Sequence, residues 1–189
     1  MLSILEAINK GELNAIVDVV ISNKPDAKGL ERAAEFGIST ACFEASKFES
    51  RKAHDLAILE FLRPRNVDYI ILAGYLIILG EEFIQEFETS IINIHPSLLP
   101  SFKGLNPHKQ ALEYGVKVAG CTTHFVTEGL DDGPIIRQSA VPVLENDTEA
   151  TLAARVLEQE HIIFPQSIKD VLEGQVVFQR RARHEKSVN

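Results

Sequence analysis

The sequence predicts an α/β protein with an open sheet in three layers, mostly parallel and completed by an antiparallel pair of strands near the C-terminus. Short β-branched runs alternate with amphipathic segments of helical length, the pattern of βαβ units around a parallel sheet. The run VDYIILA at 67–73 is almost entirely apolar, which is typical of a strand buried on both faces. Two longer apolar runs later in the chain follow one another directly, which favours an antiparallel pair.

Glycine and proline residues divide the first half of the chain into its elements. Gly11 and Gly37 follow amphipathic segments at the position where helices commonly stop, and Pro64 ends a third segment. We expect helices at 2–10, 26–36, 49–62 and 81–87, and strands at 15–22, 38–43, 67–73 and 90–94.

The second half of the chain is expected to consist of two long strands and one long helix. Strands at 116–126 and 135–143 are joined by the turn EGLDDGP at 128–134. The helix should cover 148–172, with Asn146 or Asp147 as its N-cap and Gly174 after its end. Pro165 lies within it and is expected to kink or divide it.

Length and composition indicate one ordinary globular domain, residues 1–189, of which 179–189 form a charged tail. Hydrophobic residues make up 45% and charged residues 24% of the chain, which excludes a disordered or fibrous protein. The formal net charge of −8 argues against nucleic acid and against anionic membranes as partners. The N-terminus has no basic, apolar leader pattern, so we expect a cytoplasmic protein.

The most informative segment is IINIHPSLLPSFKG at 91–104, which starts within the predicted strand 90–94. Side chains alternate faces along a strand, so Asn93 and His95 project to the same side. Pro96 then ends the strand, which places both side chains at the carboxyl edge of the sheet, where open α/β sheets bind ligands. A histidine at a strand end is more often a satisfied surface residue, but an amide placed beside it weakens that interpretation.

A carboxylate in the turn 128–134 completes a candidate catalytic set. Acidic residues in such turns usually only form the turn, and this explanation is stronger for Asp132 than for Asp131. Asn93, His95 and Asp131 together supply an oxyanion donor, a proton shuttle and a group that orients the imidazole. This set suits direct transfer of a one-carbon acyl group, since no activated nucleophile is evident. The histidines and cysteines lack metal-binding spacing, so no metal is expected.

Five segments resemble the formyltransferase family that uses 10-formyltetrahydrofolate, the last three in the same order and spacing, and the resemblance runs from residue 1 to about residue 175. They are SNKPDAKGLERA (22–33), SRKAHD (50–55), NIHPSLLPSFKG (93–104), HFVTEGLDDGPII (124–136) and NDTEATLAARVLEQEH (146–161). The resemblance implies a Rossmann-like formyltransferase fold. It also implies transfer of a formyl group from 10-formyltetrahydrofolate to the amine of glycinamide ribonucleotide, a step of purine biosynthesis.

The resemblance also implies roles for individual residues. Asn93 and protonated His95 would stabilise the oxyanion, and Asp131 would keep His95 charged and accept a proton. The folate-binding residues implied are Arg51, Leu76, Ile77, Ile78, Leu79, Asn93, Thr127, Glu128, Gly129, Leu130 and Asp131. The residues implied to bind the ribose side of the nucleotide are Leu157, Glu158, Gln159 and Glu160. Without the resemblance, 76–79 would be taken as core and Glu160 as part of a solvated helix face.

Two departures from the family pattern bear on this expectation. The family usually has an arginine at the position of Ile77, in a segment like GYxRIL, so a charged contact with the folate is lost here. The family also begins with a strand and a Gly-Ser-Asn loop that holds the nucleotide phosphate, and this sequence starts after that loop. We therefore expect weak phosphate binding and a sheet that lacks one strand, with an apolar slot in its place.

Neighbouring activities are less consistent with the sequence. The related hydrolases usually carry a second histidine after the catalytic one, where this sequence has Pro96, and the related tRNA-modifying enzymes have a further nucleic-acid-binding domain. Two alternatives stay open: a truncated form that binds folate without catalysis, and a formyltransferase that acts on an amino sugar. The sequence permits a monomer or a homodimer.

Overall fold

The computed structural model describes residues 1–179, and most of the predicted charged tail lies outside this range. Two single-turn 3₁₀ helices, Ala45–Lys47 and Arg63–Arg65, flank the third α-helix. The order of the other elements is α1 (Leu2–Asn9), β1 (Val19–Ser22), α2 (Lys28–Glu35), β2 (Ser39–Cys42), α3 (Arg51–Leu62), β3 (Ile70–Leu72), α4 (Glu81–Glu86), β4 (Ile91–His95), α5 (Pro107–Tyr114), β5 (Val118–Phe125), β6 (Ile135–Pro142) and α6 (Glu149–Leu172).

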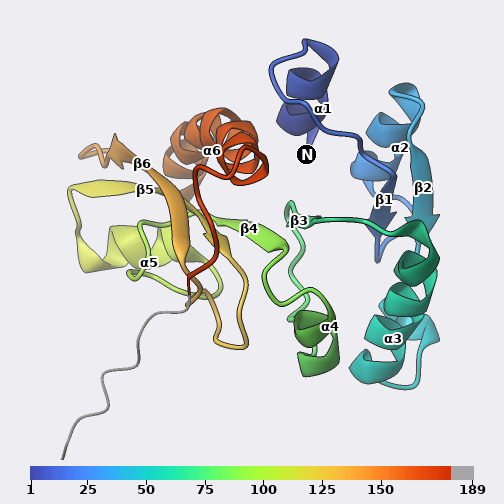
Figure 1. The fold of residues 1–189 in the computed structure, drawn as a ribbon. Coiled ribbons are helices and arrows are strands. Elements are labelled where there is room, and N and C mark those ends of the chain that lie inside the picture. The colour runs from blue at the N-terminus through green and yellow to red at the C-terminus, as the bar shows by residue number, and fades with distance from the viewer. Residues whose placement is uncertain (180–189) are drawn as a thin grey trace, which may run out of the picture.

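The strands confirm the predicted α/β class with its antiparallel pair. One sheet has the order β3-β4-β5-β6, in which β3 and β4 are parallel and the two following pairings are antiparallel (Figure 1). A second sheet contains β1 and β2, which are parallel to each other. In the antiparallel register Asn93 lies opposite His124 and His95 lies opposite Thr122, so β5 places a histidine beside the predicted catalytic strand.

The sheet is interrupted between β1 and β3, which do not pair with each other. The family resemblance led us to expect a sheet that lacks one strand, but it gave no position for the gap. The prediction that residues 67–73 form a strand buried on both faces is wrong in extent and in burial. Only Ile70–Leu72 pair, along the edge facing β4, and all three residues are half-buried; no other strand within residues 1–179 pairs with β3.

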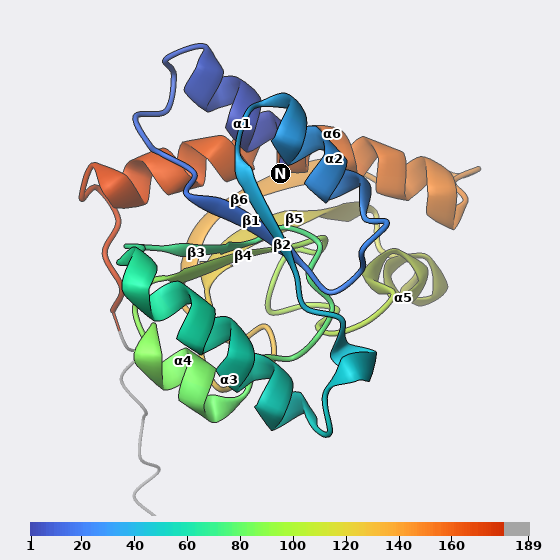
Figure 2. The same cartoon turned by 90° about the vertical axis from the view of Figure 1, so that its right-hand side faces the viewer.

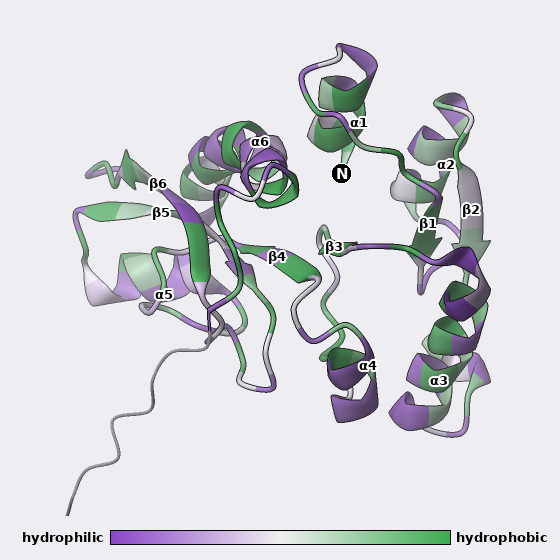
Figure 3. Ribbon diagram, viewed as in Figure 1, coloured by the Kyte–Doolittle hydropathy of each residue, from purple (hydrophilic) through white to green (hydrophobic). Residues whose placement is uncertain are grey.

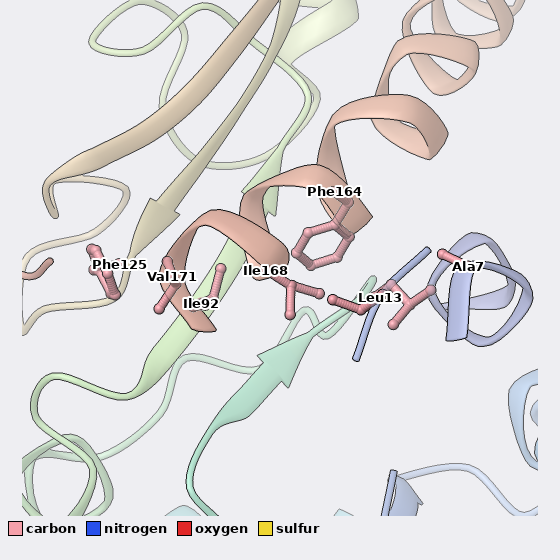
Figure 4. Packing of buried hydrophobic residues seen from close by; sticks show 8 residues of the cluster. Ala7, Leu13, Ile92, Phe125, Phe164, Ile168 and Val171 are labelled. Atoms are coloured by element: carbon pink, nitrogen blue, oxygen red, sulfur yellow. The ribbon is translucent and has the colours of Figure 1, made fainter. Parts of the chain in front are cut away.

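Helices cover both faces of the sheets, which gives the three predicted layers (Figure 2). On one face, α1 and α6 pack on β4 and β5 in a cluster that includes Ala7, Ile92, Phe125 and Phe164 (Figure 4). On the other face, α3 and α4 pack against Ile91. In Figure 3 the helices carry both hydrophilic and hydrophobic stretches, as expected for elements with one solvated face. Within residues 1–179, no helix is long and apolar enough to span a bilayer.

The C-terminal helix differs from its prediction at its start. At Pro165 the helix is continuous, so of the two expected outcomes, a kink or a division, the structure excludes division. Its N-cap is Thr148, which exchanges side-chain hydrogen bonds with Thr151, and not Asn146 or Asp147. Asp147 instead accepts hydrogen bonds from the Arg155 guanidinium and from the backbone N–H of Leu144. The carboxylate therefore braces the turn before the helix, and the shorter Thr148 hydroxyl caps the helix.

One helix was missed in the sequence. The segment Pro107–Tyr114 forms α5, although nothing helical was expected between 96 and 116. Its ends carry the usual helix signals, since Pro107 occupies the first turn and Gly115 follows the last residue with a positive φ of 80°. The helix packs through Ala111 against β5 and α6, in a cluster with Cys121 and Val156.

Candidate active site

The end of β4 presents the two polar side chains predicted from the strand pattern. Ile91 and Ile92 are fully buried in the clusters on opposite faces of the sheet. Asn93 is half-buried and His95 is buried, with 6% of its surface exposed. Because residues two apart share a face of a strand, the amide and the imidazole lie on the same side. The core residues therefore fix the strand that holds both groups.

The imidazole of His95 lies between two oxygen acceptors. Its Nδ1 is 3.3 Å from Oδ2 of Asp131, and its Nε2 is 2.9 Å from the carbonyl oxygen of Phe102. A carbonyl oxygen can only accept a hydrogen bond, so Nε2 carries a proton in this arrangement. Both ring nitrogens of His95 therefore face oxygen atoms, Nδ1 the carboxylate of Asp131 and Nε2 the Phe102 carbonyl.

Asp131 reaches His95 from a turn held in an uncommon backbone conformation. Its φ is +47°, in the left-handed region that non-glycine residues seldom occupy. Oδ2 also accepts a hydrogen bond of 2.8 Å from the backbone N–H of Gly104. The turn closes against β5 because Gly133 has no side chain, since a Cβ there would lie 1.7 Å from the Phe125 carbonyl oxygen. The strained turn thus places the Asp131 carboxylate at the end of β4.

His124 belongs to this group, and the sequence analysis did not assign it a role. Its Nδ1 donates to the carbonyl oxygen of Phe125 at 2.8 Å, which leaves Nε2 as an acceptor in the neutral ring. Nε2 lies 3.3 Å from Nδ2 of Asn93 and 3.8 Å from Oδ1 of Asp131. Burial lowers the pKa of His124, so the ring is neutral at pH 7. The neutral ring accepts one amide hydrogen of Asn93 and thereby orients the amide.

The cross-strand register is the signal that identifies His124. Asn93 and His124 are directly opposite partners of β4 and β5, and side chains of such pairs share a face. The sequence predicted both strands but gave no register between them. A one-residue shift would have turned His124 to the other face.

The residues predicted to bind folate are spread over the segment after β3, the start of α3 and the turn containing Asp131. Leu76 and Ile78 have 81% and 56% of their surface exposed, and Leu130 has 54%. Large apolar side chains that are exposed together on a surface can mark a binding site for an apolar ring. Ile77 is half-buried and Arg51 is exposed. Leu79 is buried in the core with α3 and α4, so its side chain forms core rather than pocket wall.

The four residues predicted for the nucleotide side occupy consecutive positions on α6. Leu157 and Glu158 are exposed, whereas Gln159 and Glu160 are half-buried. Gln159 Oε1 accepts a hydrogen bond of 2.7 Å from the Ser139 hydroxyl of β6. Burial raises the pKa of Glu160, and the Met1 amino group opposes this change. Gln159 and Glu160 therefore face the sheet, while the other two residues face outward.

No group of three or more histidine, cysteine, aspartate or glutamate side chains within residues 1–179 is arranged to hold a metal ion. The groups that the described structure does bring together are Asn93, His95, His124 and Asp131. Together they provide amide hydrogen-bond donors, two imidazole rings and a carboxylate at the carboxyl edge of a sheet. These groups can stabilise a negatively charged tetrahedral oxygen and can transfer protons.

The fold and the site define an α/β protein of the group-transfer class. The family model described as "Formyl transferase" matches residues 1–168. The chain therefore belongs to the formyl transferase family.

Individual relatives agree with this assignment. The chain is 41% identical over 180 residues to phosphoribosylglycinamide formyltransferase of Escherichia coli, covering 95% of this chain and 85% of that protein. It is 45% identical over 174 residues to the human trifunctional purine biosynthetic protein adenosine-3, of which it spans only 17% while 92% of this chain is covered. The crystal structure of glycinamide ribonucleotide transformylase 1 from Symbiobacterium toebii superimposes with a TM-score of 0.93 at 47% identity, covering 95% of this chain and 85% of that one.

Proposed function

We propose that this chain transfers the formyl group of 10-formyltetrahydrofolate to the amine of glycinamide ribonucleotide, a step of de novo purine biosynthesis. The observation that carries the proposal is the contact between His95 of β4 and Asp131 of the strained turn, 3.3 Å apart, with Asn93 on the same face. Family membership supports the reaction class. The names of the relatives above support the acceptor and the pathway.

The first chemical step is addition of the acceptor amine to the formyl carbon. The amine forms a new C–N bond, and the formyl C=O electrons move to oxygen, which gives a tetrahedral oxyanion. Asn93 donates one hydrogen to His124 and has a second N–H available for this oxyanion. The positive charge of His95 stabilises the developing negative charge. For Nε2 of His95 to donate to the oxyanion directly, its bond to the Phe102 carbonyl must open.

The second step breaks the bond between the formyl carbon and N10 of the folate. The attacking amine loses one proton to Asp131, directly or through a water molecule. N10 leaves with the electron pair of the broken bond and takes up a proton, which His95 can supply. Asp131 then returns a proton to His95, so the enzyme is unchanged at the end of the cycle. No acyl-enzyme is required, and every proton is accounted for.

We propose a separate side of the site for each substrate. We propose that exposed apolar residues 76 and 78, with Leu130, hold the pterin and benzoyl rings of the folate, and that Arg51 and residues 127–131 contact it from the edges. Ile77 takes the place of a charged contact. Gln159 and Glu160 of α6 are proposed to bind the ribose of the nucleotide, with Leu157 and Glu158 at the outer edge.

We further propose one formyltransferase domain that acts in the cytoplasm and needs no metal. The described core supports one domain, since Ile91 and Ile92 of β4 join the clusters on both faces of the sheet. A monomer and a homodimer are both compatible with the proposed reaction.

The proposal is tested by following formyl transfer with purified protein and each substrate alone or together. We expect consumption of 10-formyltetrahydrofolate only when glycinamide ribonucleotide is present, with formylated nucleotide as the product. Release of formate without an acceptor would indicate a hydrolase, and activity with an amino sugar would indicate a different acceptor. Folate binding without turnover would indicate an inactive relative.

A matched pair of variants tests the site itself. Asp131→Asn should lower kcat by about 100-fold or more, because it removes the proton acceptor. Asp132→Asn changes the neighbouring carboxylate, which is exposed and pairs with Lys103, and should leave kcat within about threefold of wild type. Equal losses in the two variants would contradict the assignment of Asp131.

A further inference from the structure

A buried pair of ionisable residues in α3 has no part in the proposed chemistry. His54 and Asp55 have only 1% and 3% of their surface exposed. Nε2 of His54 donates to the Phe43 carbonyl oxygen at 2.9 Å, and Nδ1 lies 3.4 Å from Oδ1 of Asp55. The ring of Phe48 contacts His54 edge-on, with centroids 5.2 Å apart. Burying a carboxylate costs free energy unless its oxygens are hydrogen-bonded. The partner of the second Asp55 oxygen therefore shows which part of the structure this carboxylate holds.

The second oxygen of Asp55 reaches the segment 73–80 that contains the proposed folate-binding residues. Oδ2 accepts a hydrogen bond of 2.8 Å from the backbone N–H of Gly80. Gly80 is the N-cap of α4 and has no side chain with which to cap the helix. A Cβ at residue 80 would lie 2.9 Å from the same Oδ2 atom, too close for a real contact. The glycine therefore allows the carboxylate to approach the start of α4, where a negative charge is favourable.

The two ends of the segment 73–80 are fixed by different means. Its start follows β3, which is paired with β4. Its end is held by Asp55 and by Leu79, which is buried against α3 and α4. Between these points Leu76 and Ile78 project with most of their surface exposed. The position of these two side chains relative to the site therefore depends on the anchor at Gly80.

Tyr75 adds a second link between this segment and Asp55. Its hydroxyl oxygen is buried without a hydrogen-bond partner in the described residues. Burial, and then the negative charge of Asp55, raise the pKa of Tyr75 to about 12. The tyrosine ring packs in the cluster formed by α3 and α4. The segment is thus held against α3 at more than one point.

We propose that Asp55 is a positioning residue for folate binding: through its bond to Gly80 it holds the segment 73–80 in the conformation that receives the folate. His54 lies on the other side of the carboxylate, with Nδ1 3.4 Å from Oδ1 of Asp55. Asp55 does not touch the reacting atoms. The proposal rests on the proposed function, because it assigns the segment to the folate side.

The test uses variants that remove the hydrogen bond between Asp55 and Gly80, keep it, or place an extra methyl group against it. Asp55→Ala removes the acceptor and should raise KM for 10-formyltetrahydrofolate by about tenfold, since hydrogen bonds to charged groups are among the stronger ones. KM for glycinamide ribonucleotide should stay within about twofold of wild type. Asp55→Asn retains an oxygen acceptor and should restore folate KM to within about threefold.

Gly80→Ala tests the contact from the other side. The φ of Gly80 is −73°, which alanine adopts freely, so only the clash with Oδ2 should act. The variant should raise folate KM like Asp55→Ala, and the double variant should be no worse than Asp55→Ala alone. Glu86→Gln is the matched control, because it breaks the exposed ion pair between Glu86 of α4 and Arg63, the residue directly after α3. Its folate KM should be unchanged.

Hydrogen exchange and calorimetry separate failure of this proposal from failure of the proposed function. Exchange at the Gly80 amide needs no substrate and should accelerate in Asp55→Ala. Calorimetric titration with 10-formyltetrahydrofolate reports affinity even if no turnover occurs. Equal increases in KM for both substrates would overturn the proposal by showing general destabilisation. Accelerated exchange with unchanged folate affinity would overturn it by showing that the anchor does not matter for binding.

Discussion

The contact between His124 and Asn93 can be tested with a double-mutant cycle. His124 is buried, neutral and placed with Nε2 toward the Asn93 amide at 3.3 Å. If its function is to orient that amide, its effect on the reaction must pass through Asn93. Phenylalanine is the appropriate replacement, because it keeps a planar ring in the buried position and removes both nitrogens.

The expected magnitudes follow from the geometry. Asn93→Ala removes a hydrogen-bond donor for the oxyanion, and loss of one such donor lowers kcat by roughly 100-fold or more. His124→Phe removes only the acceptor that orients the amide, a net contribution of about 0.5–1.5 kcal/mol, which corresponds to about 2–10-fold in kcat. Because the second effect requires the amide, the double variant should match Asn93→Ala. Independent effects would instead multiply to roughly 200–1,000-fold.

The assay is single-turnover formyl transfer at saturating concentrations of both substrates, which isolates the chemical step from binding. His124→Phe also leaves the buried Phe125 carbonyl oxygen without its imidazole donor, so a stability loss of about 1–3 kcal/mol is expected. Rates are therefore compared well below the unfolding transition of every variant. Multiplicative losses in the double variant would refute the orienting role of His124.

Two further predictions concern pH and folate affinity. Burial lowers the pKa of His124 and of His108, so below about pH 6.5 the unfolded chain binds protons that the folded chain excludes. The midpoint temperature of thermal unfolding should decrease when the pH is lowered from about 7.5 to about 5.5. His124→Phe should show a smaller decrease, and an equal decrease in both proteins would contradict this. Ile77→Arg restores a positive charge beside the proposed folate site and should lower folate KM by up to about fivefold at low salt. A KM insensitive to both the substitution and the salt concentration would show that residue 77 does not face the folate.

Local patterns predicted most elements, and the errors have physical causes. The alternation of apolar runs and amphipathic segments indicated the helices and strands, because these periods follow from local geometry. The expected strand at 15–22 forms only over Val19–Ser22, where β2 supplies a partner. The strand at 67–73 is short for the same reason, with β4 along one edge alone. Strand length depends on neighbours, and a single segment of sequence does not reveal them.

The site was predicted only in part, again because contacts between distant segments cannot be seen in a single segment of sequence. The period of two along a strand placed Asn93 and His95 on one face, and β4 confirms this pattern. The contact of Asp131 with His95 depends on a left-handed residue and on a turn closed against β5 at Gly133, neither of which periodicity predicts. His124 depends on the β4–β5 register. Asp131 was a candidate from its turn and from the family resemblance, but neither indicated His124, so the three-dimensional arrangement is what shows how the amide is held.

The contacts of Asp131 and His95 indicate different roles for the groups at the site. Oδ2 of Asp131 is occupied by the Gly104 N–H and faces His95, whereas Oδ1 lies 3.8 Å from the unprotonated Nε2 of His124. Oδ1 is therefore the better placed of the two oxygens to take a proton from the attacking amine. We infer that Asn93 supplies the direct hydrogen bond to the oxyanion, since both nitrogens of His95 already face oxygens. In the proposed reaction, His95 can donate a proton from Nε2 only when its bond to the Phe102 carbonyl opens.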